Sequence, residues 1–180
     1  MPQVRRYHAL LVWLDWVVAI LTVAALFFGA AILAHIPNSA PYKITGLSKH
    51  MIVGTLILFL VLVRLFLRNV TARPPKAATG NAFLDKVTGV SHGLLYAVLI
   101  GQALAGLILA NQSGLFSIVF AHQGAVPPDL WVYWPRKVHY LLSRLLMLLI
   151  ALHIGIALYH TFILKDGLLR RMWLGKSSTS

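Results

Sequence analysis

The chain alternates long apolar stretches with short polar connections. Four stretches are apolar almost throughout, and they cover residues 10–34, 50–67, 87–110 and 138–164. Each is near or above the roughly 20 residues that a helix needs to cross about 30 Å of hydrocarbon, and the second is at the short end of that range. Because an open sheet would leave its backbone groups unpaired in lipid, the pattern predicts four membrane-spanning helices.

The connections between these stretches are short and contain proline, as at Pro37, Pro74 and Pro127. Short connections join antiparallel neighbours, so we expect an all-α, up-down-up-down four-helix transmembrane bundle that forms one membrane domain over residues 1–180. The longest connection contains the run Trp131-Val-Tyr-Trp134, which predicts an aromatic belt at the outer interface.

The composition supports this interpretation and excludes several classes of protein. Hydrophobic residues make up 59% of the chain and charged residues only 11%, whereas a soluble domain carries roughly 25% charged residues. An ordinary soluble enzyme, a disordered tail and a coiled coil are thereby excluded. The chain contains no cysteine, which excludes disulfides, thiolate metal sites and covalent haem attachment through a Cys-x-x-Cys-His motif.

The net charge is +12, and the basic residues behind it are distributed unevenly between the two sides of the predicted membrane. Eleven Lys and Arg residues belong to the side that holds both termini and the second-to-third connection. Four belong to the other side, namely Lys43, Lys49, Arg136 and Lys137. Because basic residues accumulate in cytoplasmic loops, both termini are predicted to be cytoplasmic. Topology therefore accounts for most of the charge, and we expect membrane lipid rather than nucleic acid as a partner.

Histidines are the first candidates for chemistry, because ionisable residues inside a membrane are costly and commonly functional. His139 and His153 are 14 residues apart on the fourth predicted helix. That spacing puts them on one helix face and about 21 Å apart along the axis. Two such ligands would suit two haems stacked across a bilayer, since haem iron commonly takes axial histidine and bundle cores build cofactor sites from facing helices.

His50 begins the second predicted helix at the same depth as His139, so these two residues can clamp one haem near the outer surface. Gly54 lies four residues after His50 on the same face, where a missing side chain leaves room for a flat macrocycle or a close helix. Lys49, with Arg136 and Lys137, is placed to meet haem propionates or an acidic donor. The alternative is two unrelated interfacial histidines.

The partner of His153 is not settled by spacing. Asp15 lies at a similar depth on the first helix, but a carboxylate is a poor match for a bis-histidine haem. His8 and His160 form a further layer about 10 Å closer to the cytoplasm, where we expect solvated interfacial residues.

Asp15 is expected to be a protonated, hydrogen-bonded carboxyl, and a role in moving protons toward a quinone is the alternative. Arg144 is about 7.5 Å along the helix from His139, which is the wrong depth for pairing with Asp15. A haem propionate or a polar cavity suits Arg144 better.

Several motifs occur in an order that covers nearly the whole chain. They are Arg6-Tyr7, Leu14-Asp15-Trp16, His50 with Gly54, Val63-Arg64-Leu65 with Arg68, His92-Gly93-Leu94-Leu95-Tyr96 with Gly106, then His139, His153 and His160, and finally Lys165-Asp166-Gly167-Leu168-Leu169-Arg170-Arg171-Met172. Together they resemble the bacterial cytochrome b561 family, which comprises small four-helix di-haem cytochromes. The resemblance implies a multi-pass protein of the bacterial inner membrane that binds haem b.

The resemblance also implies iron ligands. The family's ligands for one haem match His50 and His139, and those for the other match Asp15 and His153, so one of the four histidine positions is an aspartate here. The second site is then empty, holds haem on His153 alone, or uses another ligand. Metal ligands are accordingly predicted at His50, His139 and His153, with further cofactor contacts from Gly54, Arg144 and Lys49.

Three functions remain open on the sequence. The first is electron transfer between a periplasmic-side redox partner and the quinone pool, with ubiquinone as the quinone. The second is superoxide oxidase activity, in which basic outer residues would attract the superoxide anion. The third is a membrane anchor for a larger respiratory or dehydrogenase complex.

Overall fold

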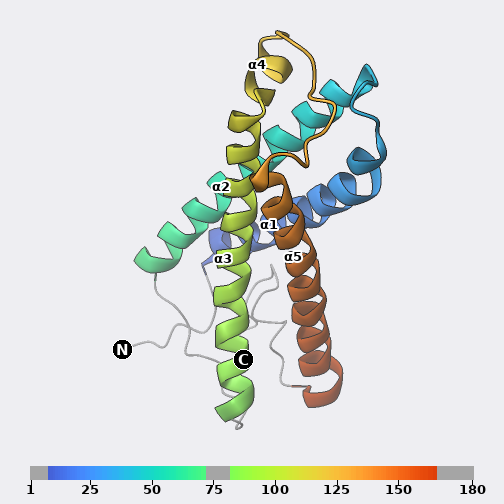
Figure 1. The fold of residues 1–180 in the computed structure, drawn as a ribbon. Coiled ribbons are helices and arrows are strands. Elements are labelled where there is room, and N and C mark those ends of the chain that lie inside the picture. The colour runs from blue at the N-terminus through green and yellow to red at the C-terminus, as the bar shows by residue number, and fades with distance from the viewer. Residues whose placement is uncertain (1–7, 72–81, 166–180) are drawn as a thin grey trace.

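A computed structural model describes residues 8–71 and 82–165, without the side chains of residues 82–88, 160 and 164. Helices make up nearly all of these residues, and no strand occurs among them. In chain order the elements are α1 (Ala9–Phe27), the π-helix η1 (Phe28–Ile32), the 3₁₀ turn η2 (Leu33–His35), α2 (Tyr42–Val70), α3 (Ala82–Gln112), α4 (Leu115–Phe120), α5 (Trp134–Tyr159) and the π-helix η3 (His160–Leu164). Figure 1 shows their arrangement.

The four predicted spans are confirmed. Four helical segments are long and apolar enough to cross a membrane, at Ala9–His35, Tyr42–Val70, Gly89–Gln112 and Trp134–Ile163. The second begins eight residues earlier than the predicted 50–67, because polar residues such as Lys43 break the apolar pattern without breaking the helix. The Lys43 Nζ donates to the carbonyl oxygens of Leu33 (2.9 Å) and Ile36 (2.7 Å), which lie where the first span ends. A buried lysine thus donates to the Ile36 carbonyl at the helix end and adds a second donor to the Leu33 carbonyl, which also accepts from the Ile36 N–H at 3.3 Å.

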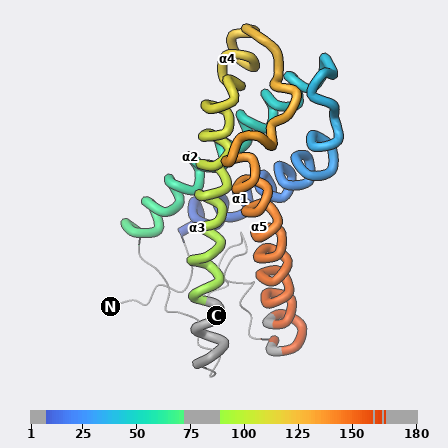
Figure 2. Tube along the Cα trace, viewed as in Figure 1, coloured from blue at the N-terminus to red at the C-terminus, as the bar shows by residue number. Residues whose placement is uncertain are grey.

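The helices pack mainly as neighbours along the chain. Helix α1 packs against α2, α2 against α3, and α3 against α5. In Figures 1 and 2 the α3–α5 pair runs lengthwise while α1 and α2 run obliquely to it. Many large apolar side chains point away from the protein, for example Ile20 (64% exposed), Phe66 (65%) and Leu141 (67%). Such an apolar surface suits lipid, which is what the predicted spans require.

A short helix covers one end of the bundle. We call this the outer end; it contains η2, α4 and the start of α2, and it is the end that the charge pattern predicts to face outward. Helix α4 was not predicted, because its six residues lie within a connection; its Leu115, Ile118 and Val119 pack with Leu33 and Leu47 in a buried cluster. The two outer connections are also joined, since Asn38 Nδ2 donates to the carbonyl oxygens of Pro127 (2.9 Å) and Pro128 (3.1 Å). The opposite end, with Asp15 and His153, is called the inner end.

Candidate cofactor site

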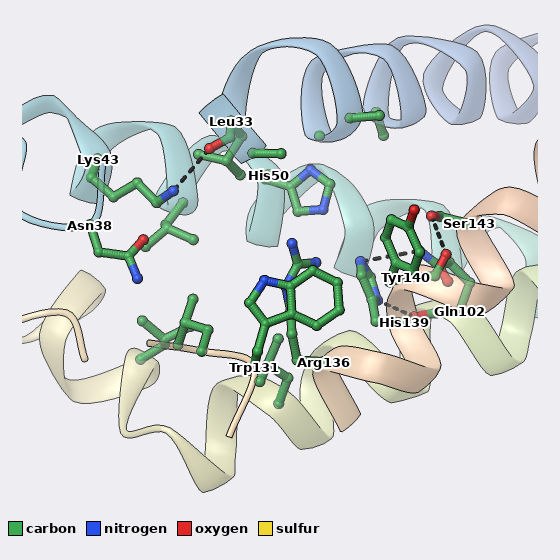
Figure 3. A pocket seen from close by; sticks show the side chains of 18 of the residues that line it. Leu33, Asn38, Lys43, His50, Gln102, Trp131, Arg136, His139, Tyr140 and Ser143 are labelled. Atoms are coloured by element: carbon green, nitrogen blue, oxygen red, sulfur yellow. Dashed lines mark hydrogen bonds between the residues drawn. The ribbon is translucent and has the colours of Figure 1, made fainter. Parts of the chain in front are cut away.

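A cavity of about 340 Å³ lies at the outer end of the bundle. Its volume is within the range of small-molecule and cofactor pockets. Residues from all four spans and from the last outer connection line it, among them Gly29, His50, Gln102, Trp131, Arg136 and His139. Figure 3 shows the ring of His50, from α2, and the ring of His139, from α5, both directed into this space.

The structure brings His50 and His139 together. Their ring centres are 6.1 Å apart and the ring planes are 80° to one another. A metal ion held by two imidazoles lies about 2 Å from each nitrogen, and each nitrogen lies about 1 Å from its ring centre, so the ring centres are roughly 6 Å apart. The observed separation therefore has room for one iron atom between the rings.

His139 is held by a main-chain contact from α3. Its Nδ1 lies 2.9 Å from the carbonyl oxygen of Gln102, and because that oxygen can only accept, Nδ1 carries the proton. Nε2 then keeps its lone pair, which is the form that binds a metal. The Gln102 side-chain Nε2 lies 3.1 Å from this nitrogen and donates to it.

Two buried polar atoms beside the cavity have no hydrogen-bond partner among the described residues. They are the His50 Nδ1 and the Gln102 Oε1. Buried polar atoms in native proteins are nearly always paired, so an unpaired ring nitrogen next to a cavity indicates a missing partner. A carboxylate of a bound haem can accept from the His50 Nδ1–H, which leaves His50 Nε2 for the iron.

Two glycines make room for the rings. A Cβ atom built on Gly29 would lie 3.0 Å from His50 Cε1, and one built on Gly106 would lie 3.1 Å from His139 Cε1. Gly29 belongs to the π-helix η1, a kind of helical irregularity that is frequent at functional sites. Gly54, predicted to leave room for a macrocycle, has no atom within 4 Å of a Cβ built there; its role stays a prediction.

Cationic side chains border the same cavity. Arg136 and Arg144 both line it, and their guanidinium carbons lie 4.7 Å from the Trp131 ring centre and 4.9 Å from the Tyr140 ring centre. Arg144 thus lines the cavity, and its predicted contact with a cofactor stays a prediction. Lys49 is exposed and is not among the lining residues, so its predicted contact with a cofactor stays a prediction. Trp131, assigned to an aromatic belt, lines the cavity as well.

The inner end is arranged differently. His153 contacts His92 with ring centres 5.1 Å apart and planes at 85°. Asp15 pairs with Arg64 through Oδ1 and Nε, and its side chain is 24% exposed against 15% for that of Arg64. The predicted hydrogen bond of Asp15 is confirmed, with the Arg64 guanidinium as its donor, while its protonation stays a prediction. Arg64 also lies over the Tyr96 ring, 5.3 Å from its centre.

The remaining histidines do not join either pair. His8 caps α1, since its Nδ1 accepts from the Leu10 N–H at 3.3 Å. The His160 side chain lies outside the described residues. Among the described residues no group of three or more His, Cys, Asp or Glu side chains could hold a metal ion. The histidine pair therefore suits a metal whose other ligands come from a macrocycle, as the iron of haem has.

Comparison with known proteins identifies the family of this chain. The family model described as prokaryotic cytochrome b561 matches residues 6–175. Cytochrome b562 of Cereibacter sphaeroides is 32% identical over 96% of this chain and 98% of its own length. The probable superoxide oxidase CybB of Yersinia pestis is 24% identical over 93% of this chain and 96% of its own. Cytochrome b561 homolog 1 of Escherichia coli K12 is 25% identical over 93% of this chain and 97% of its own length. The chain thus belongs to the prokaryotic cytochrome b561 family of haem-binding, electron-transferring proteins, and it is a multi-pass protein of the bacterial inner membrane.

Proposed function

We propose that this chain holds a haem b between His50 and His139 and carries electrons between a redox partner on the outer side and the quinone pool. The observation that carries the proposal is the pair of facing imidazoles, 6.1 Å apart at the edge of a cavity. A haem bound there would supply a one-electron couple between ferric and ferrous iron.

The residues around the pair support this role in separate ways. The Gln102 carbonyl oxygen fixes the tautomer of His139 and leaves Nε2 free of a proton. Gly29 and Gly106 let the rings approach the backbones of η1 and α3. Arg136 and Arg144 offer guanidinium groups that can pair with carboxylates such as the propionates of haem. The resemblance of the sequence to the cytochrome b561 family is what supports a quinone as the electron acceptor.

Ligand substitutions test the haem site. We expect His50→Ala and His139→Ala to lose the haem absorbance of the purified protein, measured as pyridine haemochrome per mole of chain. His35→Ala is the matched control, since His35 is exposed at the end of η2 and lies outside the cavity lining. A His139→Ala protein with an unchanged haem spectrum would contradict the proposal.

A second candidate is superoxide oxidase activity, in which two superoxide ions each give one electron and become dioxygen, while one quinone takes these two electrons and two protons from water. Arg136 and Arg144 at the cavity favour it, because a cationic opening raises the arrival rate of an anion. Asp129 also lines the cavity, and its Oδ1 accepts from the Trp131 N–H at 2.7 Å. The relative from Yersinia pestis is named a probable superoxide oxidase.

Quinone reduction in proteoliposomes separates the two candidates. If the chain oxidises superoxide, a superoxide source will drive ubiquinone reduction, and added salt or Arg136→Gln will slow it by screening or removing the charge. A rate equal to that of protein-free liposomes would reject this activity while leaving electron transfer from another donor intact.

A further inference from the structure

The two histidine pairs of the bundle differ in the room that they leave for a metal. The ring centres of His50 and His139 are 6.1 Å apart, while those of His92 and His153 are 5.1 Å apart. Iron between two imidazoles requires roughly 6 Å. The inner pair is about 1 Å closer than an iron site requires. Both pairs are edge-on, at 80° and 85°, so the separation and not the ring angle distinguishes them.

Asp15, which lies at a similar depth to His153, forms an ion pair with Arg64. Asp15 occupies the position that matches the family's ligand partner of His153, but its carboxylate is paired with Arg64. Both side chains are mostly buried, at 24% and 15% exposed. In an apolar surrounding each charge needs the other, because removing one partner of a buried pair leaves an uncompensated charge.

An aromatic ring contacts the arginine of the ion pair. Tyr96 of α3 presents its ring to two cations of α2, with the guanidinium carbons of Arg64 and Arg68 at 5.3 Å and 5.8 Å from the ring centre. Arg64 is therefore held by Asp15 on one helix and by an aromatic ring on another. Helices α1, α2 and α3 are joined here by charge and aromatic contacts.

We propose that this chain carries a single haem, at the outer end, and that the Asp15–Arg64 ion pair replaces the second haem that its family implies. The inference rests on the proposed function, since it assumes the haem between His50 and His139. It has a consequence for electron transfer. A chain with one redox centre at its outer end meets both its donor and its acceptor in the outer half of the membrane, so the quinone has to reach that half.

The first test counts haems in the unaltered chain. We expect one haem per chain, from pyridine haemochrome against amino-acid analysis, and one transition in a potentiometric titration. His153→Ala and His92→Ala should leave the haem ratio and the spectrum unchanged, whereas His139→Ala abolishes both. Two haems in the unaltered chain, or a haem lost with His153, would overturn the inference and leave the proposed function standing. A haem-free chain would overturn both.

The second test restores a ligand. Because Asp15 matches the family's ligand position opposite His153, we expect Asp15→His to raise the ratio from one haem to two per chain and to add a second potentiometric transition. Asp15→Asn is the matched control, since it removes the charge, keeps an oxygen that can accept from Arg64 Nε, and offers no imidazole; it should stay at one haem. Adding His153→Ala to Asp15→His should return the ratio to one.

The outcomes of the second test are also decisive. A gain of haem in Asp15→Asn would show that the charge rather than the missing ligand excludes the second haem, and a folded Asp15→His protein that still holds one haem would show that residue 15 is not what excludes it. The second result overturns the role given to the ion pair, whereas the first keeps that role and assigns it to the charge of Asp15 rather than to the missing imidazole. If Asp15→His does not fold, the effect of His153→Ala on the otherwise unaltered chain still decides the number of haems.

Discussion

His139 donates from Nδ1 to the main-chain carbonyl oxygen of Gln102, 2.9 Å away. The acceptor belongs to the backbone of α3, so it sets the ring orientation whatever the side chain at residue 102. The side-chain amide of Gln102 instead donates to Nε2, the nitrogen that a haem iron would bind. One residue therefore orients the ligand through its backbone and competes for the ligand atom through its side chain.

This arrangement predicts the effect of changing the Gln102 side chain. Gln102→Leu should keep a full haem ratio, because the orienting carbonyl remains and the competing amide is removed. The haem content per chain after purification measures this, with His139→Ala as the reference for complete loss. Loss of haem in Gln102→Leu would show that the side chain, not the backbone, holds the site.

The glycines behind the two rings give a steric prediction. Gly29→Ala would place a Cβ 3.0 Å from His50 Cε1, closer than ordinary van der Waals contact, so the ring or the helix has to shift. We expect a lower haem affinity and a changed low-spin electron paramagnetic resonance signal, and the same for Gly106→Ala beside His139. Gly89→Ala is the control, because a Cβ there meets no atom within 4 Å. Identical spectra in all three variants would show that the rings tolerate the contact.

Lys43 gives a prediction about stability. Its buried ammonium donates to two carbonyl oxygens at the end of the first span. Lys43→Met should lower the free energy of unfolding by about 2 kcal/mol, since two hydrogen bonds from a charged donor are lost and the Ile36 carbonyl loses its donor. The exposed Lys49 is the matched control, and Lys49→Met should change the free energy by less than about 0.5 kcal/mol. Unfolding by SDS in mixed micelles measures both, and equal effects would refute the capping role.

The ion pair at the inner end gives a further prediction. Asp15→Leu should cost about 3 kcal/mol in unfolding free energy, because it leaves the Arg64 guanidinium buried without its carboxylate. The double variant Asp15→Leu with Arg64→Leu should recover most of that loss, since a matched apolar pair needs no charge partner. The same SDS titration provides the double-mutant cycle, and additive losses would mean that the two charges do not stabilise each other.

The sequence by itself determined the membrane-spanning helices and the depth of the histidines along them. Both follow from one-dimensional quantities, namely the length of the apolar runs and the 1.5 Å rise per residue. The pairing of His50 with His139 could be predicted for that reason, because antiparallel spans place residues of equal depth beside one another. The early start of α2 could not, since Lys43 is polar in sequence and finds its acceptors only in the folded chain.

Only the tertiary structure decided which faces of the helices contact one another. The carbonyl of Gln102 and the bare backbones of Gly29 and Gly106 contact the histidine rings because of helix rotation and crossing, which hydropathy does not encode. Their only sequence signal was a polar or glycine residue within an apolar run. Depth alone also permitted Asp15 to pair with Arg64, as both lie near the inner end, but only the rotation of α1 against α2 brings these two side chains into contact.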